Sequence, residues 1–165
     1  MHPYPRHVPG FDYLGQHRYF LTFCTDQRRA LFLDQNAVRL VERHFLRLAA
    51  ERGFADLAHC FMPDHFHAVV AGRHDSADLK AFVTRMKQFS GYHFQRDFGC
   101  RLWQRYSYER VLRGDESTGA VIRYVLENPI RAELVASVQD YPFIGSSEYS
   151  LEQLLEFCIG GGASG

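Results

Sequence analysis

Two histidines separated by one phenylalanine are the residues whose spacing points most clearly to chemistry. His65, Phe66 and His67 begin an apolar stretch, to Ala71, that is typical of a strand. Side chains at i and i+2 of a strand share one face, so both imidazoles point one way while Phe66 points the other. Two such imidazoles can share a divalent ion, which then needs a ligand from another element. The alternative is a pair of core or half-exposed histidines, in a chain that has nine.

The third ligand has two candidate sources. His59, in the preceding predicted strand, is one, but it is equally well explained as a core histidine. The favoured source is the segment 123–129, Arg-Tyr-Val-Leu-Glu-Asn-Pro, where Tyr124 and Asn128 are four residues apart and share a helical face. This spacing can place a phenol nucleophile and an oxygen ligand in one cleft, with Glu127 as the fallback ligand.

A structural interpretation of the same segment stays open. Asn128 followed by Pro129 is typical of an N-cap and first turn of another short helix. Tyr124 could then be an ordinary core residue of an amphipathic helix.

Cations interleaved with aromatic side chains form a third group. They lie in the predicted second helix, around the predicted fourth strand and in the N-terminal arm. The candidate DNA-binding cations are Lys80, Lys87, Arg101, Arg105 and Arg6. Cations contact phosphates and aromatic faces stack on unpaired bases. The alternative is a solvated helix face and a sheet core.

The net charge of zero conceals an uneven distribution. Residues 1–131 carry 19 Lys and Arg against 14 Asp and Glu, whereas residues 132–165 carry none against 5. Seventeen of the 19 cations are arginines, whose planar guanidinium suits phosphate. The distribution permits a nucleic-acid partner, although a solvated surface with an acidic tail explains it too.

Composition narrows the class of protein. With 165 residues, 46% of them hydrophobic, the chain is long enough for one domain with a core, which excludes wholesale disorder. No apolar run approaches the ~20 residues of a membrane span. The four cysteines form no Cys-x-x-Cys pair, so we expect reduced thiols and a cytoplasmic location.

Hydrophobic periodicity predicts the elements that position these residues. Strands are expected at 17–25, 54–61, 65–71 and 102–112, and helices at 34–52, from Ser76 or Asp75 past Phe89, and 117–127. Asp34 is the expected cap of the first helix, and Pro129 is expected to block the third. The order β-α-β-β-α-β predicts an α+β, ferredoxin-like fold with an antiparallel sheet and an added tyrosine-bearing helix.

We expect one domain over residues 1–145, of which 1–16 form an irregular arm. Residues 146–165 are expected to form a tail that is acidic and then Gly-rich.

Five short motifs occur in a fixed order over about residues 8–145. They are Phe20-Leu-Thr-Phe-Cys-Thr, Met62-Pro-Asp-His-Phe-His, Met86-Lys-Gln-Phe, Leu102-Trp-Gln-Arg and Tyr124-Val-Leu-Glu-Asn-Pro. Together they resemble the REP-associated tyrosine transposases, a branch of the single-tyrosine transposase-like proteins in the HUH (His-hydrophobe-His) nuclease superfamily.

The resemblance implies a metal-dependent endonuclease and strand transferase that acts on single-stranded DNA hairpins formed by repetitive extragenic palindromes. Carried over by position, Tyr124 is the nucleophile that forms a 5′-phosphotyrosine, while His65, His67 and Asn128 bind Mg²⁺ or Mn²⁺. The family more often has Asn where this chain has Asp64, which is either an extra carboxylate near the metal or a cap of the turn. A monomer is favoured over a homodimer, with a nucleoid-associated location.

Three other interpretations are weaker. A replication or mobilisation relaxase shares the paired histidines but usually carries further domains. A non-catalytic single-stranded nucleic-acid-binding module on the same fold would need neither Tyr124 nor the histidine pair. A zinc hydrolase or deaminase would carry His-x-Glu and Pro-Cys-x-x-Cys, which this chain lacks.

Overall fold

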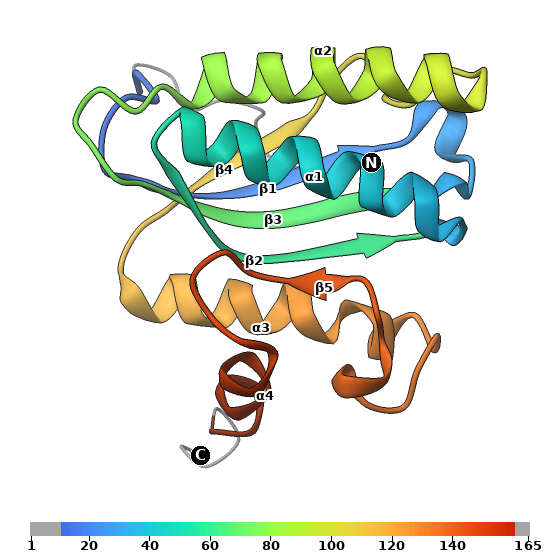
Figure 1. Ribbon diagram of the computed structural model, residues 1–165. Coiled ribbons are helices and arrows are strands. Elements are labelled where there is room, and N and C mark those ends of the chain that lie inside the picture. The colour runs from blue at the N-terminus through green and yellow to red at the C-terminus, as the bar shows by residue number, and fades with distance from the viewer. Residues whose placement is uncertain (1–10, 161–165) are drawn as a thin grey trace.

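A five-stranded antiparallel sheet lies between two layers of helices in the computed structural model, which describes residues 11–160 (Figure 1). The strands are β1 (Arg18–Cys24), β2 (Phe54–Met62), β3 (His65–Gly72), β4 (Tyr108–Leu112) and β5 (Ile144–Gly145). Their order across the sheet is β4-β1-β3-β2-β5, and each neighbouring pair is antiparallel. The predicted α+β class with an antiparallel sheet is therefore confirmed.

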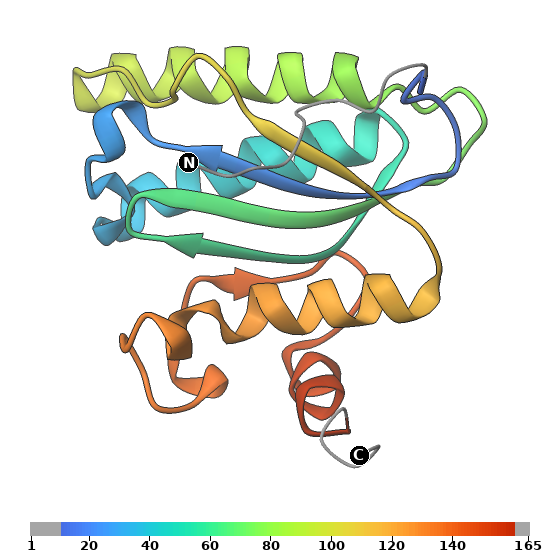
Figure 2. The same ribbon diagram turned by 180° about the vertical axis from the view of Figure 1, so that it is seen from behind.

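The helices divide between the two faces of the sheet. Figures 1 and 2 show α1 (Gln35–Glu51) and α2 (Leu79–Phe98) on one face, and α3 (Asp115–Arg131) and α4 (Leu151–Gly160) on the other. Short 3₁₀ turns occur at 26–28, 31–33 and 138–140. Within the described part of the chain, no helix combines the length and apolarity that crossing a membrane requires.

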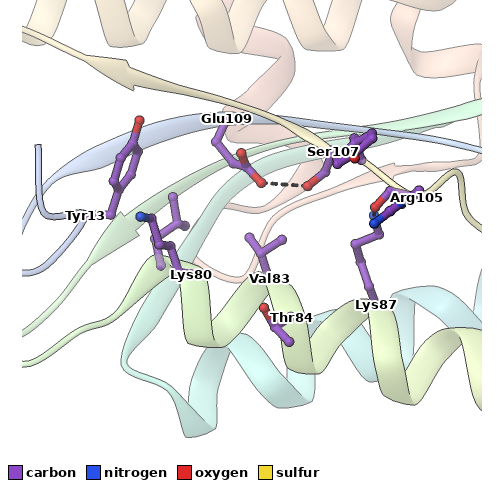
Figure 3. A pocket seen from close by; sticks show the side chains of 10 residues that line it. Tyr13, Lys80, Val83, Thr84, Lys87, Arg105, Ser107 and Glu109 are labelled. Carbon is purple, nitrogen blue, oxygen red and sulfur yellow. Dashed lines mark hydrogen bonds between the residues drawn. The ribbon is translucent and has the colours of Figure 1, made fainter. Parts of the chain in front are cut away.

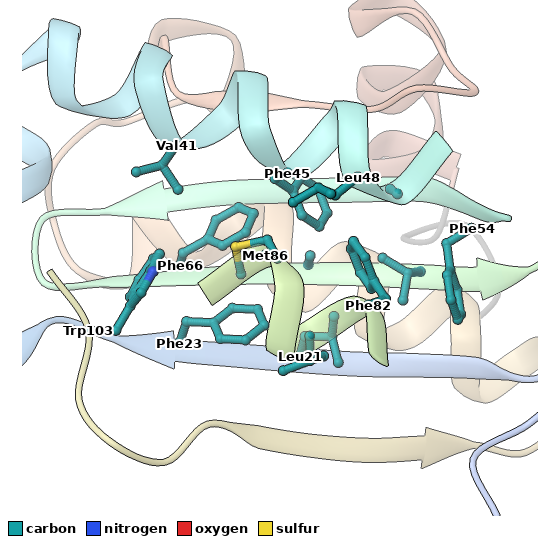
Figure 4. Close-up of a cluster of buried hydrophobic side chains, with 14 of the residues drawn as sticks. Leu21, Phe23, Val41, Phe45, Leu48, Phe54, Phe66, Phe82, Met86 and Trp103 are labelled. Carbon is teal, nitrogen blue, oxygen red and sulfur yellow. The ribbon is translucent and has the colours of Figure 1, made fainter. Parts of the chain in front are cut away.

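The main core lies between the sheet and the α1–α2 layer. Phe23, Phe66 and Leu21 project from the strands and meet α1 and α2 side chains such as Phe45 and Met86 (Figure 4). Because side chains alternate along a strand, burying Phe66, Ala68 and Val70 on this face turns His65 and His67 to the opposite one. The core thus orients the histidine pair towards α3.

Short-range capping explains where the first two helices begin. The Asp34 side chain accepts a hydrogen bond from the Asn36 backbone N–H at 2.8 Å, as predicted. Helix α2 starts later than predicted, because Asp78, rather than Ser76 or Asp75, caps it by accepting from the Ala81 backbone N–H at 3.1 Å.

Helix α3 does not stop at Pro129, and the prediction that this proline blocks it is wrong. The helix continues through Pro129 to Arg131, and the Ala132 N–H donates to the Asn128 carbonyl at 3.0 Å. A proline in the last turn removes one backbone donor, which a helix about to end tolerates. Asn128 is therefore a residue within α3 that faces the histidine pair, and the alternative in which it caps another short helix is wrong.

The later elements depart furthest from prediction. Only Tyr108–Leu112 of the expected strand 102–112 forms β4; upstream, Trp103 makes a single bridge to Thr25 and is buried in the core. Strand β5 and helix α4 were not predicted. The Leu154 side chain of α4 is buried beside α3, so part of the expected tail is helical.

Candidate active site

Strand β3 presents His65 and His67 on the sheet face that α3 covers. Their ring centroids are 4.5 Å apart, and the ring planes are 72° apart. The register places His67 opposite Thr22 of β1, and His65 opposite Cys24. The structure thus brings the two imidazoles together on one face, as the period of the strand predicts.

Both imidazoles are held through their Nδ1 atoms. His67 Nδ1 lies 2.9 Å from the Thr22 hydroxyl oxygen, and His65 Nδ1 lies 2.8 Å from Asp64 Oδ1. Because a carboxylate only accepts, His65 Nδ1 carries a proton, so a neutral His65 ring keeps its lone pair at Nε2. This arrangement aims the basic nitrogen of His65 at α3.

Asp64 is in turn held by an arginine that the sequence analysis did not single out. Arg28 donates a hydrogen bond from Nε to Asp64 Oδ2 at 2.9 Å, and its Nη2 forms an ion pair with the same oxygen at 2.9 Å. Burial alone would raise the pKa of the Asp64 carboxyl, but the hydrogen bonds from His65 and Arg28 outweigh it and hold that pKa below its ordinary value. The carboxylate therefore lies beside His65 Nδ1, on the side of the ring away from Nε2.

Helix α3 brings Tyr124 and Asn128 to the histidine pair. The Asn128 amide nitrogen is 3.4 Å from His65 Nε2. The Tyr124 ring centroid lies 6.2 Å from that of His67 and 6.1 Å from that of Phe20, which it meets edge-on. Tyr124 remains 48% exposed, so its side chain stands at the open side of the cluster.

Arg131 completes the surroundings of Tyr124 and was missed from the sequence. Its guanidinium carbon lies 4.0 Å from the centre of the Tyr124 ring, and its Nη2 donates to the Tyr124 carbonyl. The signal in the sequence is the spacing: a residue seven positions after Tyr124 returns to the same face of a helix after two turns.

The two weaker ligand candidates lie elsewhere. His59 points to the α1 side of the sheet, where Nδ1 bonds to Asp56 Oδ2 at 2.6 Å and Nε2 to Glu42 Oε2 at 2.8 Å. His59 is thus a core histidine, which was the alternative interpretation. Glu127 lies near Cys158 of α4, where its charge adds to burial in raising the pKa of that thiol.

Three of the five candidate DNA-binding cations surround one cavity between α2 and β4: Lys80, Lys87 and Arg105 (Figure 3). The exposed Arg101 side chain donates to the Trp103 carbonyl at 3.0 Å. Arg6 lies outside the described residues.

The donor types at the site limit which groups could hold a metal. Among the described side chains, those of residues 11–114 and 117–158, no three His, Cys, Asp or Glu form a group that could bind an ion. The oxygen-bearing amide nearest to the histidine pair is that of Asn128. The Asn128 amide is thus a group from α3 that lies close enough to share a ligand with His65.

The model of the family described as "Transposase IS200 like" matches residues 14–128, a range that contains both histidines, Tyr124 and Asn128. This chain belongs to that family. Transposases are enzymes that process DNA, so membership excludes the zinc hydrolase and deaminase interpretations.

Individual relatives agree with the family match. A Haemophilus influenzae protein named as a REP-associated tyrosine transposase is 25% identical over 137 residues, which cover 76% of this chain and 77% of the relative. The solved structure of a REP-associated tyrosine transposase bound to a REP hairpin superimposes with a TM-score of 0.70 at 21% identity, over 87% of this chain and 82% of that one.

A Deinococcus radiodurans protein described as a transposase matches with a TM-score of 0.52 at 25% identity, over 74% of this chain and 97% of that one. The resemblance predicted from the five ordered motifs is thus confirmed, and so is the fold.

Proposed function

We propose that this protein is a metal-dependent single-stranded DNA endonuclease and strand transferase that acts on hairpins of repetitive extragenic palindromes. The observation that carries the proposal is the convergence of Tyr124 and Asn128, from α3, on His65 and His67 of β3. The similar protein that was solved with a REP hairpin supports the choice of substrate.

His65, His67 and Asn128 are the proposed metal ligands, and the donor set fits a divalent ion. Both Nδ1 atoms are engaged by Asp64 and Thr22, an arrangement that commonly orients metal-binding histidines. Two imidazoles and one amide leave coordination positions for water and phosphate oxygens, as Mg²⁺ and Mn²⁺ require. When bound, the ion would supply a Lewis acid that polarises the scissile phosphate.

Tyr124 is the proposed nucleophile. Its phenolic oxygen attacks phosphorus in line; the Tyr124 O–P bond forms, the P–O3′ bond breaks, and the phenolic proton is transferred to the departing 3′ oxygen. The products are a free 3′-OH and a 5′-phosphotyrosine, so the phosphodiester is exchanged rather than hydrolysed. Another 3′-OH can reverse the step and rejoin DNA without ATP.

The chain's own residues favour this attack in two ways. A neutral phenol is a poor nucleophile, and the Arg131 guanidinium against the ring places a positive charge beside the attacking group. The exposure of Tyr124 lets a strand approach from solvent. A single-stranded substrate is expected because in-line attack requires a backbone free to bend.

The proposal is tested by covalent capture. The protein is incubated with single-stranded DNA hairpins carrying the source genome's repeated palindromes, with Mg²⁺ or Mn²⁺, and run on a denaturing gel. Tyr124→Phe is compared with Tyr149→Phe, because Tyr149 is 47% exposed, against 48% for Tyr124. We expect a protein–DNA band for the wild type and Tyr149→Phe, and none for Tyr124→Phe.

Two outcomes would contradict the proposal. An adduct in Tyr124→Phe would assign the nucleophile to another residue. Retarded but uncut DNA on a native gel, with no adduct under either metal, would favour a non-catalytic single-stranded DNA-binding module on the same fold.

A further inference from the structure

A cavity of about 340 Å³ opens between α2 and strand β4, on the sheet face opposite Tyr124 (Figure 3). Lys80 and Thr84 of α2 form one wall, and Ser107 and Glu109 form the facing wall. Alternation along β4 puts Glu109 in this cavity and turns the neighbouring Tyr108 to the α3 side, where its ring lies 6.4 Å from that of Phe20. The cavity and the tyrosine site thus lie back to back at one edge of the sheet.

The inner end of the cavity carries a buried carboxylate. Glu109 is only 9% exposed, and its Oε1 accepts a hydrogen bond from the Ser107 hydroxyl at 2.6 Å. Among the side chains of residues 11–114 and 117–158, which the structure describes, no second hydrogen bond to this carboxylate is found. An ionised carboxylate has about four acceptor positions, so Glu109 offers acceptors to a ligand that brings N–H donors.

The rim of the cavity is cationic and aromatic. Lys80 Nζ lies 5.2 Å from the centre of the Tyr13 ring, and the Arg105 guanidinium lies 5.3 Å from that of Tyr106, which is 56% exposed. Lys87 differs from Lys80 and Arg105 because its ammonium donates hydrogen bonds to the Gln104 and Arg105 backbone carbonyls at 2.9 and 3.0 Å. Lys87 therefore holds the wall segment in place, while Lys80 and Arg105 supply charge at the opening.

We propose that this cavity, the Glu109 pocket, binds one unpaired nucleobase that carries an amino group, within the single-stranded substrate. The proposal rests on the DNA-binding part of the proposed function. A nucleotide matches the charge pattern, since Glu109 repels a phosphate from the inner end while Lys80 and Arg105 attract it at the rim. The exposed Tyr106 ring offers a face for stacking. The volume lies at the small end of ligand pockets, ~300–1,000 Å³, which suits one nucleotide and excludes a duplex.

The carboxylate also sets a preference among the bases. Guanine presents two parallel donors, N1–H and the N2 amino group, to the two oxygens of one carboxylate. Cytosine and adenine present one amino group each. Thymine presents one N–H between two carbonyl oxygens, and a carboxylate repels these oxygens. We expect guanine to bind best and thymine worst.

The position of the pocket explains how one strand reaches both sites. Among the strands of the described part of the chain, β4 is the last one on this side of the sheet, so the two faces of the sheet meet at its edge. Tyr108, Phe20 and Tyr124 follow one another on the α3 face, with ring centroids 6.4 and 6.1 Å apart. A single strand passing around the edge would place one base against Glu109 and a backbone phosphate near Tyr124.

The test is a binding series that needs no cleavage. Fluorescein-labelled strands of about ten thymidines, with one central thymidine replaced by G, C or A or left unchanged, are titrated by anisotropy. For the wild type we expect the G-containing strand to bind about tenfold more tightly than the all-thymidine strand, within the range of one good base contact. Glu109→Gln is expected to lose this preference but to bind the all-thymidine strand as tightly as the wild type does. The control Glu51→Gln, on α1, is expected to keep both the preference for guanine and the affinity for the all-thymidine strand.

A second variant covers the case in which Glu109→Gln does not fold, which circular dichroism would show. Thr84→Phe, at an exposed position of α2, fills the cavity from its other wall and should also abolish the preference. The proposal is overturned if wild-type protein binds the four strands equally or binds none, or if a folded variant keeps the preference for guanine. Adduct formation by wild-type protein in that case would leave the tyrosine chemistry standing and remove only the pocket.

Discussion

Each histidine of the site is fixed by a different kind of partner, and the difference has a chemical consequence. His65 Nδ1 bonds to a carboxylate that Arg28 also holds, whereas His67 Nδ1 meets a neutral hydroxyl. The charged partner makes His65 the more strongly oriented of the two. His65 is also the histidine beside Asn128, so the proposed ligands are organised around it.

Removing His65 should therefore weaken binding at the proposed metal site while the fold survives. We expect His65→Ala to weaken Mn²⁺ binding at least tenfold, about the minimum seen when groups that merely support metal ligands are lost. Electron paramagnetic resonance of free Mn²⁺ measures this without DNA. His74→Ala, at an exposed position, is the control. Unchanged Mn²⁺ affinity in a folded His65→Ala protein would count against the assigned ligands.

Arg131 should act on the chemical step rather than on DNA binding. Replacing it with Met keeps much of the side-chain length and removes the cation against the Tyr124 ring. We expect adduct formation to slow about two- to fivefold, the scale of a solvent-exposed cation–π contact, and the affinity for the hairpin to change little. Equal loss of affinity and rate would show that Arg131 holds DNA instead.

At this scale, the sequence reveals what depends on local spacing and hides what depends on long-range contact. His65 and His67 share a face because strands have a period of two, and Tyr124 and Asn128 do so because of the helical period. The partner of Asp64, Arg28, lies 36 residues away in a 3₁₀ turn, which no local pattern could reveal. That the two faces meet was inferred from the resemblance to a family, not from periodicity.

At the scale of elements, regular segments were predictable and segments defined by their contacts were not. The first helix and first three strands were predicted to within about two residues, because periodicity and the Asp34 cap agree. The apolar stretch around Trp103 resembles a strand because that ring fills the core from a loop. Strand β5 has only two residues, and contacts with β2 hold it.

Those contacts centre on a buried histidine. The His59 ring bonds to Glu42 of α1 and Asp56 of β2, and it packs so closely on β5 that a Cβ at Gly145 would lie 2.8 Å from a ring carbon. The Ser147 hydroxyl oxygen accepts a hydrogen bond from the Asp56 backbone N–H at 3.0 Å, which ties the segment after β5 to β2 as well. One charged cluster therefore joins α1, β2 and β5.

This cluster should make stability fall on the alkaline side. Burial would lower the pKa of His59, but the two carboxylates outweigh it and raise that pKa from 6.5 to about 9. Folding thus favours the protonated ring, and the stability it contributes is complete below pH 6.5 and lost as the pH rises through 9. We expect the melting temperature to decline between these values, and His59→Gln to be less stable with a flatter profile. A wild-type melting temperature that rises over this range would refute the assignment.

At the scale of the whole molecule, the sheet separates two tasks. One face carries the proposed transesterification site under α3, while the other carries the main core and the Glu109 pocket under α2. Strand β1 lies between β3, which carries the histidine pair, and β4, which carries Glu109. The division could not be predicted from the sequence, since Lys80, Lys87 and Arg105 gave no sign of which face they occupy or of the carboxylate beside them.

Helix α3 folds back on the sheet of its own chain, so the phenol and the imidazoles that surround it come from a single polypeptide. In the proposed reaction, one nucleophile per site lets each molecule hold one severed end at a time. Excising a segment would then require two severed ends, and so either two molecules acting together or one that completes each exchange before starting the next. A lone molecule would therefore rejoin what it has cut unless a different 3′-OH reached the phosphotyrosine first. Under this proposal, the supply of free ends, rather than the enzyme, decides whether DNA moves.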